Sequence, residues 1–302
     1  MKLTRALSKR SWLAVALALA FSAQAEAQFF GHNFPGDYGL FAGSQAPPGR
    51  YAGFFLPYYR ADTIKLEEGI ALGGRDGVVD VIAFAPFVSY VSELKIAGGN
   101  YGFVIAPSFA NANLDIPRLD VDVDQFGVGD LYVVPFQLGW HLERTDMTAS
   151  YGFFAPTGRY EVGANDNIGL GMWSHELAFG FTQYLDREST WSFATEAFYE
   201  IHTTKRDVDI RAGDWFVLEG GLGKEFDGGW RLGAAYYALW QTTDASGADV
   251  PADLLGRKIR SFGLGPDLEL LQGALVLRAL CEFGAQNTLE GFIFFGSLAL
   301  PF

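Results

Sequence analysis

The chain has 302 residues, of which 49% are apolar and 16% aromatic, and its formal net charge is −13. Such an acidic chain, without a polybasic patch, excludes nucleic acid as a partner. Because Cys281 is the single cysteine, the chain cannot form an internal disulfide.

The first residues have the features of an export signal. Four basic residues, Lys2 to Arg10, precede an apolar run from Trp12 to Phe21 that is too short for a permanent membrane helix. Small residues follow in the arrangement Ala23-Gln24-Ala25. The sequence therefore predicts a signal peptide over residues 1–25, with a second cleavage option after residue 27. Its removal takes away four basic residues and changes the net charge to −17.

Residues 26–49 form a second unit before the regular pattern begins. From Phe29 onward this segment is rich in glycine, proline and aromatic residues, which indicates a non-regular path. Two interpretations stay open. The segment either folds into the following domain as a plug or packs on its periplasmic rim as a tail.

The remainder of the chain alternates bulky and small or polar residues with a period of two. Between residues 131 and 140, for example, Tyr132, Val134, Phe136, Leu138 and Trp140 share one face, and the period is that of a strand. The predicted strands are residues 51–61, 78–91, 100–107, 131–140, 147–153, 173–185, 191–202, 216–226, 230–240, 262–270, 275–283 and 292–302.

Beyond the signal, no run of eighteen apolar residues could form a membrane helix. Only helices and closed barrels satisfy every backbone group inside lipid. The aromatic alternation therefore predicts an all-β fold, a transmembrane antiparallel up-and-down β-barrel of about twelve strands over residues 50–302, in the outer membrane of a Gram-negative bacterium. A soluble β-sandwich is the alternative that alternation alone permits.

The connections and the strand ends favour the membrane. Short turns near residues 143–146, 186–189, 226–229 and 271–273 alternate with long loops at 64–76, 111–126, 157–167, 203–214 and 242–257, as periplasmic turns alternate with outer loops. Aromatic residues near strand ends predict a girdle at the headgroups. Its proposed tryptophans are Trp140, Trp173, Trp191, Trp215, Trp230 and Trp240.

The terminal Phe302 resembles the signal read by barrel-assembly machinery, which the sequence thus predicts as a partner, together with outer-membrane lipid and lipopolysaccharide. If the aromatic faces meet lipid, the charged residues on the other face point inward. The lumen-lining candidates are Glu176, Glu196, Glu200, Glu219, Arg231, Asp267, Glu269, Arg278 and Glu282, with Glu225 and Arg60 also predicted to point inward.

Counting from the turns predicts that Glu176, Glu200 and Glu219 lie at similar heights on three consecutive strands. Two interpretations of the inward charges stay open. They either line a polar, selective conduit or form an internal salt-bridge network with Arg231 and Arg278 that fills a narrow barrel.

Two possible chemical sites carry less weight. Asp120, Asp122 and Asp124 could hold a divalent cation, but a solvated acidic loop is favoured because the glycine and distal glutamate of an EF-hand are missing. The run Ser174-His175-Glu176 cannot form a catalytic relay because strand neighbours point to opposite faces. His202 shares a face with Glu200, yet no serine nucleophile with oxyanion donors is evident. We therefore predict no enzyme activity, no metal site and no cofactor.

Several segments resemble the bacterial family named for the meta-pathway of phenol degradation, and the likeness covers nearly the whole mature chain. They are residues 36–39, 43–49, 59–62, 100–103, 129–132, 151–160, 169–174 and 263–266, the longest of which reads YGFFAPTGRY. The resemblance implies an outer-membrane barrel described as a transporter. On this basis we expect passive diffusion of small hydrophobic or aromatic compounds, and the alternative is a structural or adhesive barrel with a closed lumen.

Overall fold

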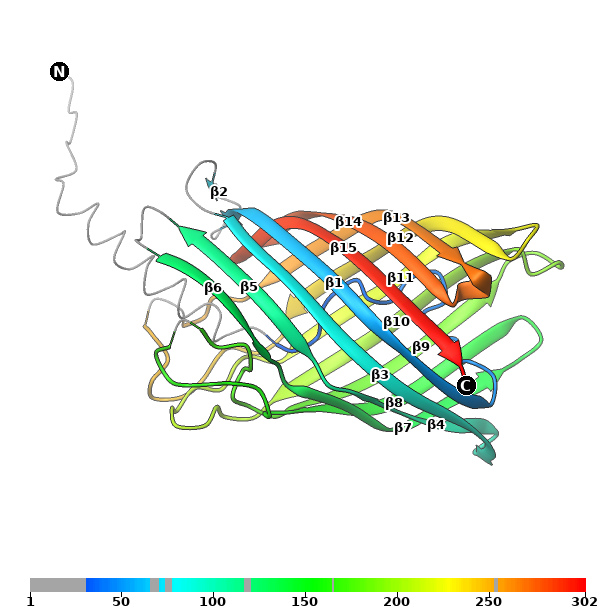
Figure 1. The fold of residues 1–302 in the computed structure, drawn as a ribbon, viewed down its shortest axis with the longest axis horizontal. Helices are drawn as coiled ribbons and strands as arrows, with labels where there is room; N and C mark the ends of the chain where they lie inside the picture. The colour runs from blue at the N-terminus through cyan, green and yellow to red at the C-terminus, as the bar shows by residue number, and fades with distance from the viewer. Residues whose placement is uncertain (1–30, 66–70, 74–77, 117–120, 165, 253–254) are drawn as a thin grey trace, which may run out of the picture.

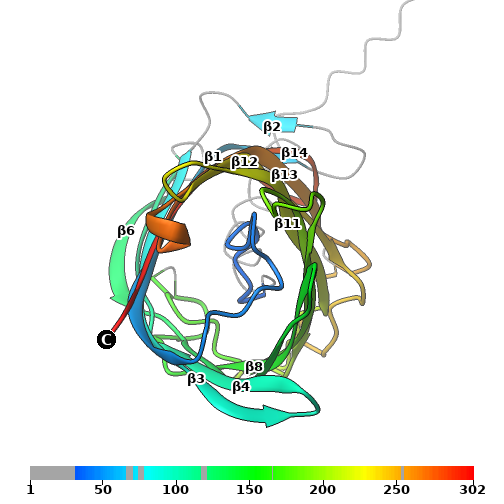
Figure 2. The same ribbon diagram turned by 90° about the vertical axis from the view of Figure 1, so that its right-hand side faces the viewer.

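A computed structural model describes residues 31–65, 71–73, 78–116, 121–164, 166–252 and 255–302, so the predicted signal peptide lies outside the described residues. One antiparallel sheet closes into a barrel (Figures 1 and 2). Within the described ranges, no helix is long and apolar enough to cross a membrane. The strands are β1 (Gly49–Lys65), β2 (Ala71–Gly73), β3 (Val78–Ile96), β4 (Gly99–Ala106), β5 (Phe109–Ile116), β6 (Val121–Val128), β7 (Leu131–His141), β8 (Thr145–Ala155), β9 (Ser174–Tyr184), β10 (Trp191–His202), β11 (Trp215–Phe226), β12 (Trp230–Gln241), β13 (Arg260–Leu270), β14 (Leu275–Gln286) and β15 (Thr288–Pro301).

The wall of the barrel has twelve strands, as the sequence predicts. β3 pairs with β4 along one half and with β5 along the other, so β4 and β5 are one strand interrupted at residues 107–108. β6 and β7 are likewise one strand interrupted at residues 129–130. The short β2 only adds to the edge of β1. Pairing of β1 with β15, from Tyr51 opposite Pro301 to Lys65 opposite Thr288, closes the ring.

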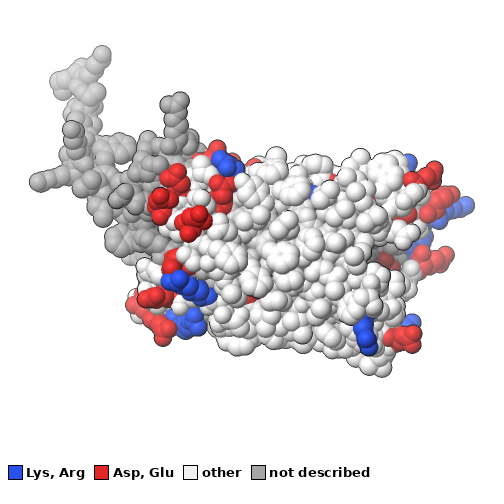
Figure 3. Space-filling view, viewed as in Figure 1, with Lys and Arg blue, Asp and Glu red and all other residues white. Residues whose placement is uncertain are grey.

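The two faces of the wall differ in chemistry because successive side chains alternate between lipid and lumen. On β9, Leu177 and Phe179 are more than half exposed, whereas Glu176, next to Leu177 in the chain, is buried. On the face seen in Figure 3, the middle of the surface is almost free of charged residues, and charged residues gather at both ends. An apolar belt of this kind is the surface that a transmembrane β-barrel presents to lipid.

The two ends of the barrel also differ. The short turns lie at the end where the chain terminates, which is the periplasmic end, and the long loops lie at the opposite, outer end (Figure 1). A tight connection at Asn287, which has a φ of 53°, joins β14 to β15 at the outer end and departs from the long-loop pattern. Elsewhere the outer loops fold on one another, with Ile210, Ala245 and Val250 forming a small apolar cluster.

One predicted loop is wrong. Most of residues 111–126 belong to the β5–β6 hairpin rather than to a loop, and they keep a period of two. Toward the tip of this hairpin the outward side chains are polar, for example Asn113 and Asp124, which lie opposite each other, whereas Phe126 and Val128 lie on the same face nearer the barrel. A polar outward face is expected where a hairpin extends beyond lipid into water, and its polarity led the sequence to suggest a loop.

Two side chains face the opposite way from the prediction. Trp215 is buried, with 3% of its surface exposed, so it is not part of the lipid-facing girdle, because β11 points its odd-numbered residues inward. Arg60 is not in the lumen. Its side chain is 54% exposed and forms an ion pair with Asp80 at 3.1 Å. The first strand is apolar on both faces, so the alternation of its residues does not show which face is inward, and the direction of Arg60 could not be predicted from it.

Candidate functional site: the occupied lumen

The lumen contains the N-terminal segment of the described chain, residues 31–48, which we call the plug (Figure 2). The plug has no regular secondary structure, so it cannot pair its backbone N–H groups with a neighbouring strand. Instead, several of these groups donate to carboxylates on the inner wall. This arrangement connects the predicted inward acids directly to the segment whose place the sequence left open.

Four wall carboxylates accept these backbone hydrogen bonds. Glu200 on β10 accepts from the N–H of His32 at 2.7 Å and of Asn33 at 3.1 Å. Glu219 on β11 accepts from the N–H of Gly36 at 2.9 Å and of Tyr38 at 3.0 Å. Glu196 accepts from the N–H of Gly43 at 3.1 Å, and Asp267 accepts from that of Leu40 at 3.3 Å. All four acids are buried, so the plug N–H groups take the place of solvent.

Glycines allow the plug to approach the wall closely. Gly43 has a φ of 79°, a left-handed conformation that L side chains rarely adopt. A Cβ atom at this position would also collide with the backbone of Phe181 on β9. The contact between Gly43 and Glu196 therefore depends on the absence of a side chain.

His32 forms the most connected contact of the plug. Its Nε2 lies 2.7 Å from Asp130 Oδ2, and its Nδ1 lies 2.6 Å from Ser174 Oγ. The imidazole ring stacks on Phe154 with 4.7 Å between centroids, and Phe154 stacks in turn on Tyr132 at 4.4 Å. The plug is thus fixed both by polar contacts and by an aromatic stack.

Sequence reasoning missed the partners of Ser174. The structure confirms that Ser174 and Glu176 point inward while His175 lies on the other face, where the hydroxyl of Tyr151 contacts its ring at 2.8 Å. Ser174 Oγ instead contacts His202 Nδ1 at 2.8 Å and the plug residue His32. Ser174 has no exposed surface, so these contacts join the plug to the wall. No pattern in the sequence relates His32 to a strand 142 residues away.

The heights of the acids differ from the prediction. Glu176 lies directly opposite Glu200 in the pairing of β9 with β10, as expected. Glu219, however, lies opposite Glu196 rather than beside Glu200, whose partner on β11 is Trp215. The connection between β10 and β11 is long, so the sequence does not fix which residues of the two strands lie opposite each other. The predicted pairing of Glu219 with Glu200 was therefore wrong by four residues.

The basic residues of the lumen pair with other acids. Arg278 donates to Asp267 through Nη2 at 2.7 Å and through Nε at 3.0 Å, and its Nη1 donates to the plug carbonyl of Gly36 at 2.7 Å. Arg231 contacts Glu225 at 2.8 Å and Glu269 at 3.2 Å. Its guanidinium also lies over the ring of plug residue Phe41, 3.9 Å from the centroid.

The other two acids have uncharged partners. Glu282 accepts from the hydroxyls of Tyr59, at 3.0 Å, and Tyr237, and from the N–H of Gly291 at 2.7 Å. Glu176 accepts from the hydroxyl of Tyr132 at 2.7 Å and the side-chain amide of plug residue Asn33 at 2.9 Å. Glu176, Glu200 and Glu219 therefore do not form ion pairs with Arg231 or Arg278 in the described structure, contrary to the salt-bridge hypothesis for those three.

The suggested cation site receives no structural support. Asp120 lies outside the described residues, and Asp122 and Asp124 are exposed on β6, where Asp124 accepts a hydrogen bond from Asn111 at 3.0 Å. Among the residues that the structure describes, no group of three or more metal-ligating side chains comes together.

Near His32, one strand of the wall lacks a hydrogen-bonded neighbour along one of its edges. β8 ends at Ala155, so in the described structure β6 pairs with β5 alone, and its other edge has no strand beside it. The loop that follows β8 approaches this edge: the N–H of Arg159 donates to the carbonyl of Val128 at 3.3 Å, and Ile168 lies against Gly127. The exposed side chains of Phe126 and Val128 border it on the outer face.

Comparison with solved structures identifies the fold. The barrel is similar to the COG4313 outer membrane channel from Pseudomonas putida F1, with a TM-score of 0.72 and 15% identity over 90% of this chain and 100% of that chain. Weaker likenesses include the CymD monoaromatic hydrocarbon channel, with a TM-score of 0.43 and 11% identity over 85% of this chain and 90% of the other. The β domain of the Bordetella autotransporter BrkA also has a TM-score of 0.43, with 12% identity over 85% of this chain and 100% of that one.

No curated protein sequence matches the chain. A family model matches residues 59–295 of the chain, which are nearly the whole barrel. The family is described as "Putative MetA-pathway of phenol degradation". The chain therefore belongs to this family of outer-membrane β-barrels.

Proposed function

We propose that this protein is an outer-membrane channel for passive diffusion of small hydrophobic or aromatic compounds, and that the plug controls access to it. Family membership and the shared fold of a known outer-membrane channel support the proposal.

The observation that carries the proposal is the chemistry by which the plug is held. Backbone hydrogen bonds to Glu196, Glu200, Glu219 and Asp267 can be exchanged for hydrogen bonds to water, because each partner is a polar group that water also satisfies. On this proposal the plug leaves the wall without unfolding the barrel, and in doing so it also gives up the apolar contacts of Phe34 and Tyr38 with the wall. The carboxylates then become a polar lining, as the conduit hypothesis requires.

The interrupted wall supplies a route suited to apolar solutes. The unpaired edge of β6 lies close in sequence to Asp130, which holds His32 of the plug. A solute that entered from the outer end and left between β6 and β8 would have to displace the loop of residues 157–170, whose Gly158 and Leu170 donate to Asp130. The aromatic pair Tyr132 and Phe154 offers apolar contact along this route.

Catalysis fits the site less well. Asp130, His32 and Ser174 are hydrogen-bonded in series, as in a hydrolase relay, yet Ser174 is completely buried and His32 belongs to the plug. A structural barrel with a closed lumen is the second candidate, and the occupied lumen is the observation that favours it. The two candidates differ in whether the protein transmits solute.

Uptake by proteoliposomes separates them. Vesicles with and without the purified barrel would be exposed to toluene, phenol and a sugar of similar size, and entry would be followed by a fluorescent reporter or by swelling. We expect the protein to accelerate entry of the aromatic solutes more than that of the sugar. Equal entry in vesicles with and without the protein would support the closed structural barrel instead.

A further inference from the structure

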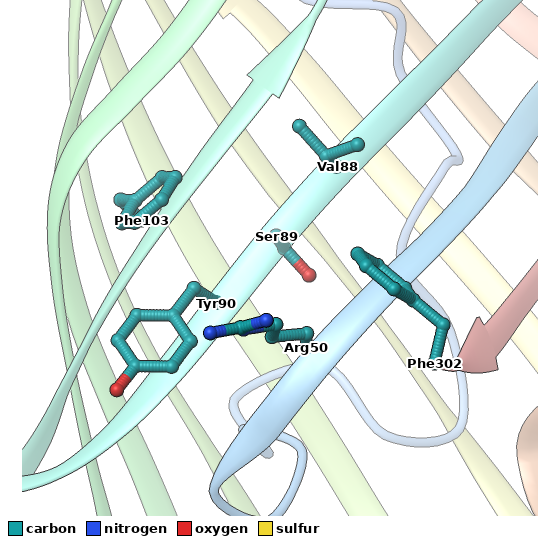
Figure 4. Close-up of a pocket in the computed structure, with 6 residues that line it drawn as sticks. All are labelled: Arg50, Val88, Ser89, Tyr90, Phe103 and Phe302. Atoms are coloured by element: carbon teal, nitrogen blue, oxygen red, sulfur yellow. The ribbon is translucent and has the colours of Figure 1, made fainter.

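A groove of about 380 Å³ lies on the outer surface of the barrel near its periplasmic end (Figure 4). The strand register explains its position. Arg50 on β1 lies opposite Tyr90 on β3, and Tyr90 lies opposite Phe103 on β4, so the three side chains share the outward face. The N–H of Phe302 donates to the carbonyl of Arg50 at 3.1 Å, which places the terminal residue on the other side of β1. The lining residues are Arg50, Val88, Ser89, Tyr90, Phe103 and Phe302.

The chemistry of this groove is unusual for a lipid-facing wall. Phenylalanine, tyrosine and valine side chains supply most of its surface, and a single guanidinium extends across it toward Tyr90 (Figure 4). Arg50 is exposed, and no carboxylate of the described chain, including the C-terminal one, forms an ion pair with it. Arg60, on the same face of the same strand but at the outer end, is paired with Asp80 at 3.1 Å.

A cation beside lipid without a counter-charge calls for an anionic partner from the membrane. The groove lies where β15 ends, at the level of the periplasmic leaflet, which consists of phospholipid. A phospholipid combines a phosphate with long acyl chains, and the groove combines a guanidinium with an apolar floor between two aromatic rings. Tyr90 adds a hydroxyl at the headgroup level, as aromatic belts do.

We propose that this groove binds one phospholipid of the periplasmic leaflet, with its phosphate on Arg50 and one acyl chain between Phe103 and Phe302. The bound lipid would cover the end of the seam between β1 and β15 that closes the barrel. This inference is independent of the proposed transport function, because the groove faces lipid and not the lumen.

Native mass spectrometry of the full-length barrel in mild detergent tests the proposal. Delipidated protein would be titrated with phosphatidylglycerol and, separately, with diacylglycerol, which has the same chains but no phosphate. We expect one tightly bound phosphatidylglycerol per barrel and weaker binding of diacylglycerol. Because a basic residue near a lipid surface contributes about 1 kcal/mol, Arg50→Gln should weaken the phosphatidylglycerol complex about fivefold and abolish the preference for phosphate.

Two further variants complete the experiment. Arg60→Gln, a matched outward arginine at the other end of β1, should leave binding unchanged, and Phe103→Ala should weaken both lipids alike. Equal affinity of wild type and Arg50→Gln, or equal loss in Arg60→Gln, would overturn the proposal. If Arg50→Gln fails to fold, the comparison of the two lipids on the wild-type protein decides the question, since equal binding of both would refute a phosphate site.

Discussion

The contacts of Glu200 predict how firmly the plug is held. Glu200→Ala removes the acceptor of two plug N–H groups, the part-buried one of His32 and the buried one of Asn33, and leaves both without a protein partner. An unsatisfied buried group costs about 1–3 kcal/mol, so the substitution should weaken seating of the plug by about 2–6 kcal/mol. Even the lower figure corresponds to about a 30-fold increase in the population of the open plug.

Hydrogen–deuterium exchange with mass spectrometry measures this population directly. Peptides covering residues 31–38 should exchange at least about 30-fold faster in Glu200→Ala, while peptides from β12 and β13 should stay protected. Glu282→Ala is the matched control, because Glu282 is also an inward acid but its partners Tyr59, Tyr237 and Gly291 all belong to the wall. Unchanged exchange of the plug in Glu200→Ala, or equally accelerated exchange in Glu282→Ala, would show that Glu200 does not hold the plug.

Three other substitutions give separate tests. Arg278→Ala leaves Asp267 as a buried charge without its cationic partner, which costs about 3–5 kcal/mol, so the barrel should unfold at a lower temperature in the heat-shift assay on gels. Arg60→Ala is the control, because the exposed ion pair of Arg60 is screened by solvent and contributes little to stability. An equal effect of the two substitutions would contradict this prediction. Gly43→Ala should displace the plug and raise conductance in planar bilayers, whereas Gly163→Ala, which has a similar φ of 78° but open space around it, should not. Phe302→Ala should reduce the amount of folded barrel in outer membranes if assembly machinery reads the terminal aromatic, and normal amounts would count against that partner.

The wall of the barrel could be predicted from the sequence because lipid imposes one chemical rule on every strand. Leu177 and Phe179 must face lipid, so Glu176 must face inward, and this parity needs no knowledge of neighbouring strands. Register is harder to predict. It depends on the connection between strands, and the long segment between β10 and β11 left Glu219 at the wrong height.

Features that depend on more than one strand could not be predicted. The interruption at residues 129–130 arises because β8 ends at Ala155 while β6 continues, and no local pattern records the length of a neighbour. The place of the plug was undecidable for the same reason. The hydrogen bonds from His32 and Gly43 to the wall join residues that are 98 to 168 positions apart in the sequence. The glycines and prolines of the plug indicate only that its backbone is irregular.

Control of passage by the plug is tested most directly when the plug is fixed reversibly in place. Ser44 on the plug donates to Asp146 on the wall at 2.8 Å, so cysteines at both positions, in a chain whose own Cys281 is changed to Ser, can be joined through disulfides by a short bis-methanethiosulfonate linker that reduction removes. The part of the phenol flux that the protein adds to that of protein-free vesicles should be lost on cross-linking and restored on reduction, while the Ser44→Cys single variant should keep this part under both conditions. Equal flux of the double variant in the cross-linked and reduced states, with the cross-link verified by mass, would contradict the claim that the plug controls passage.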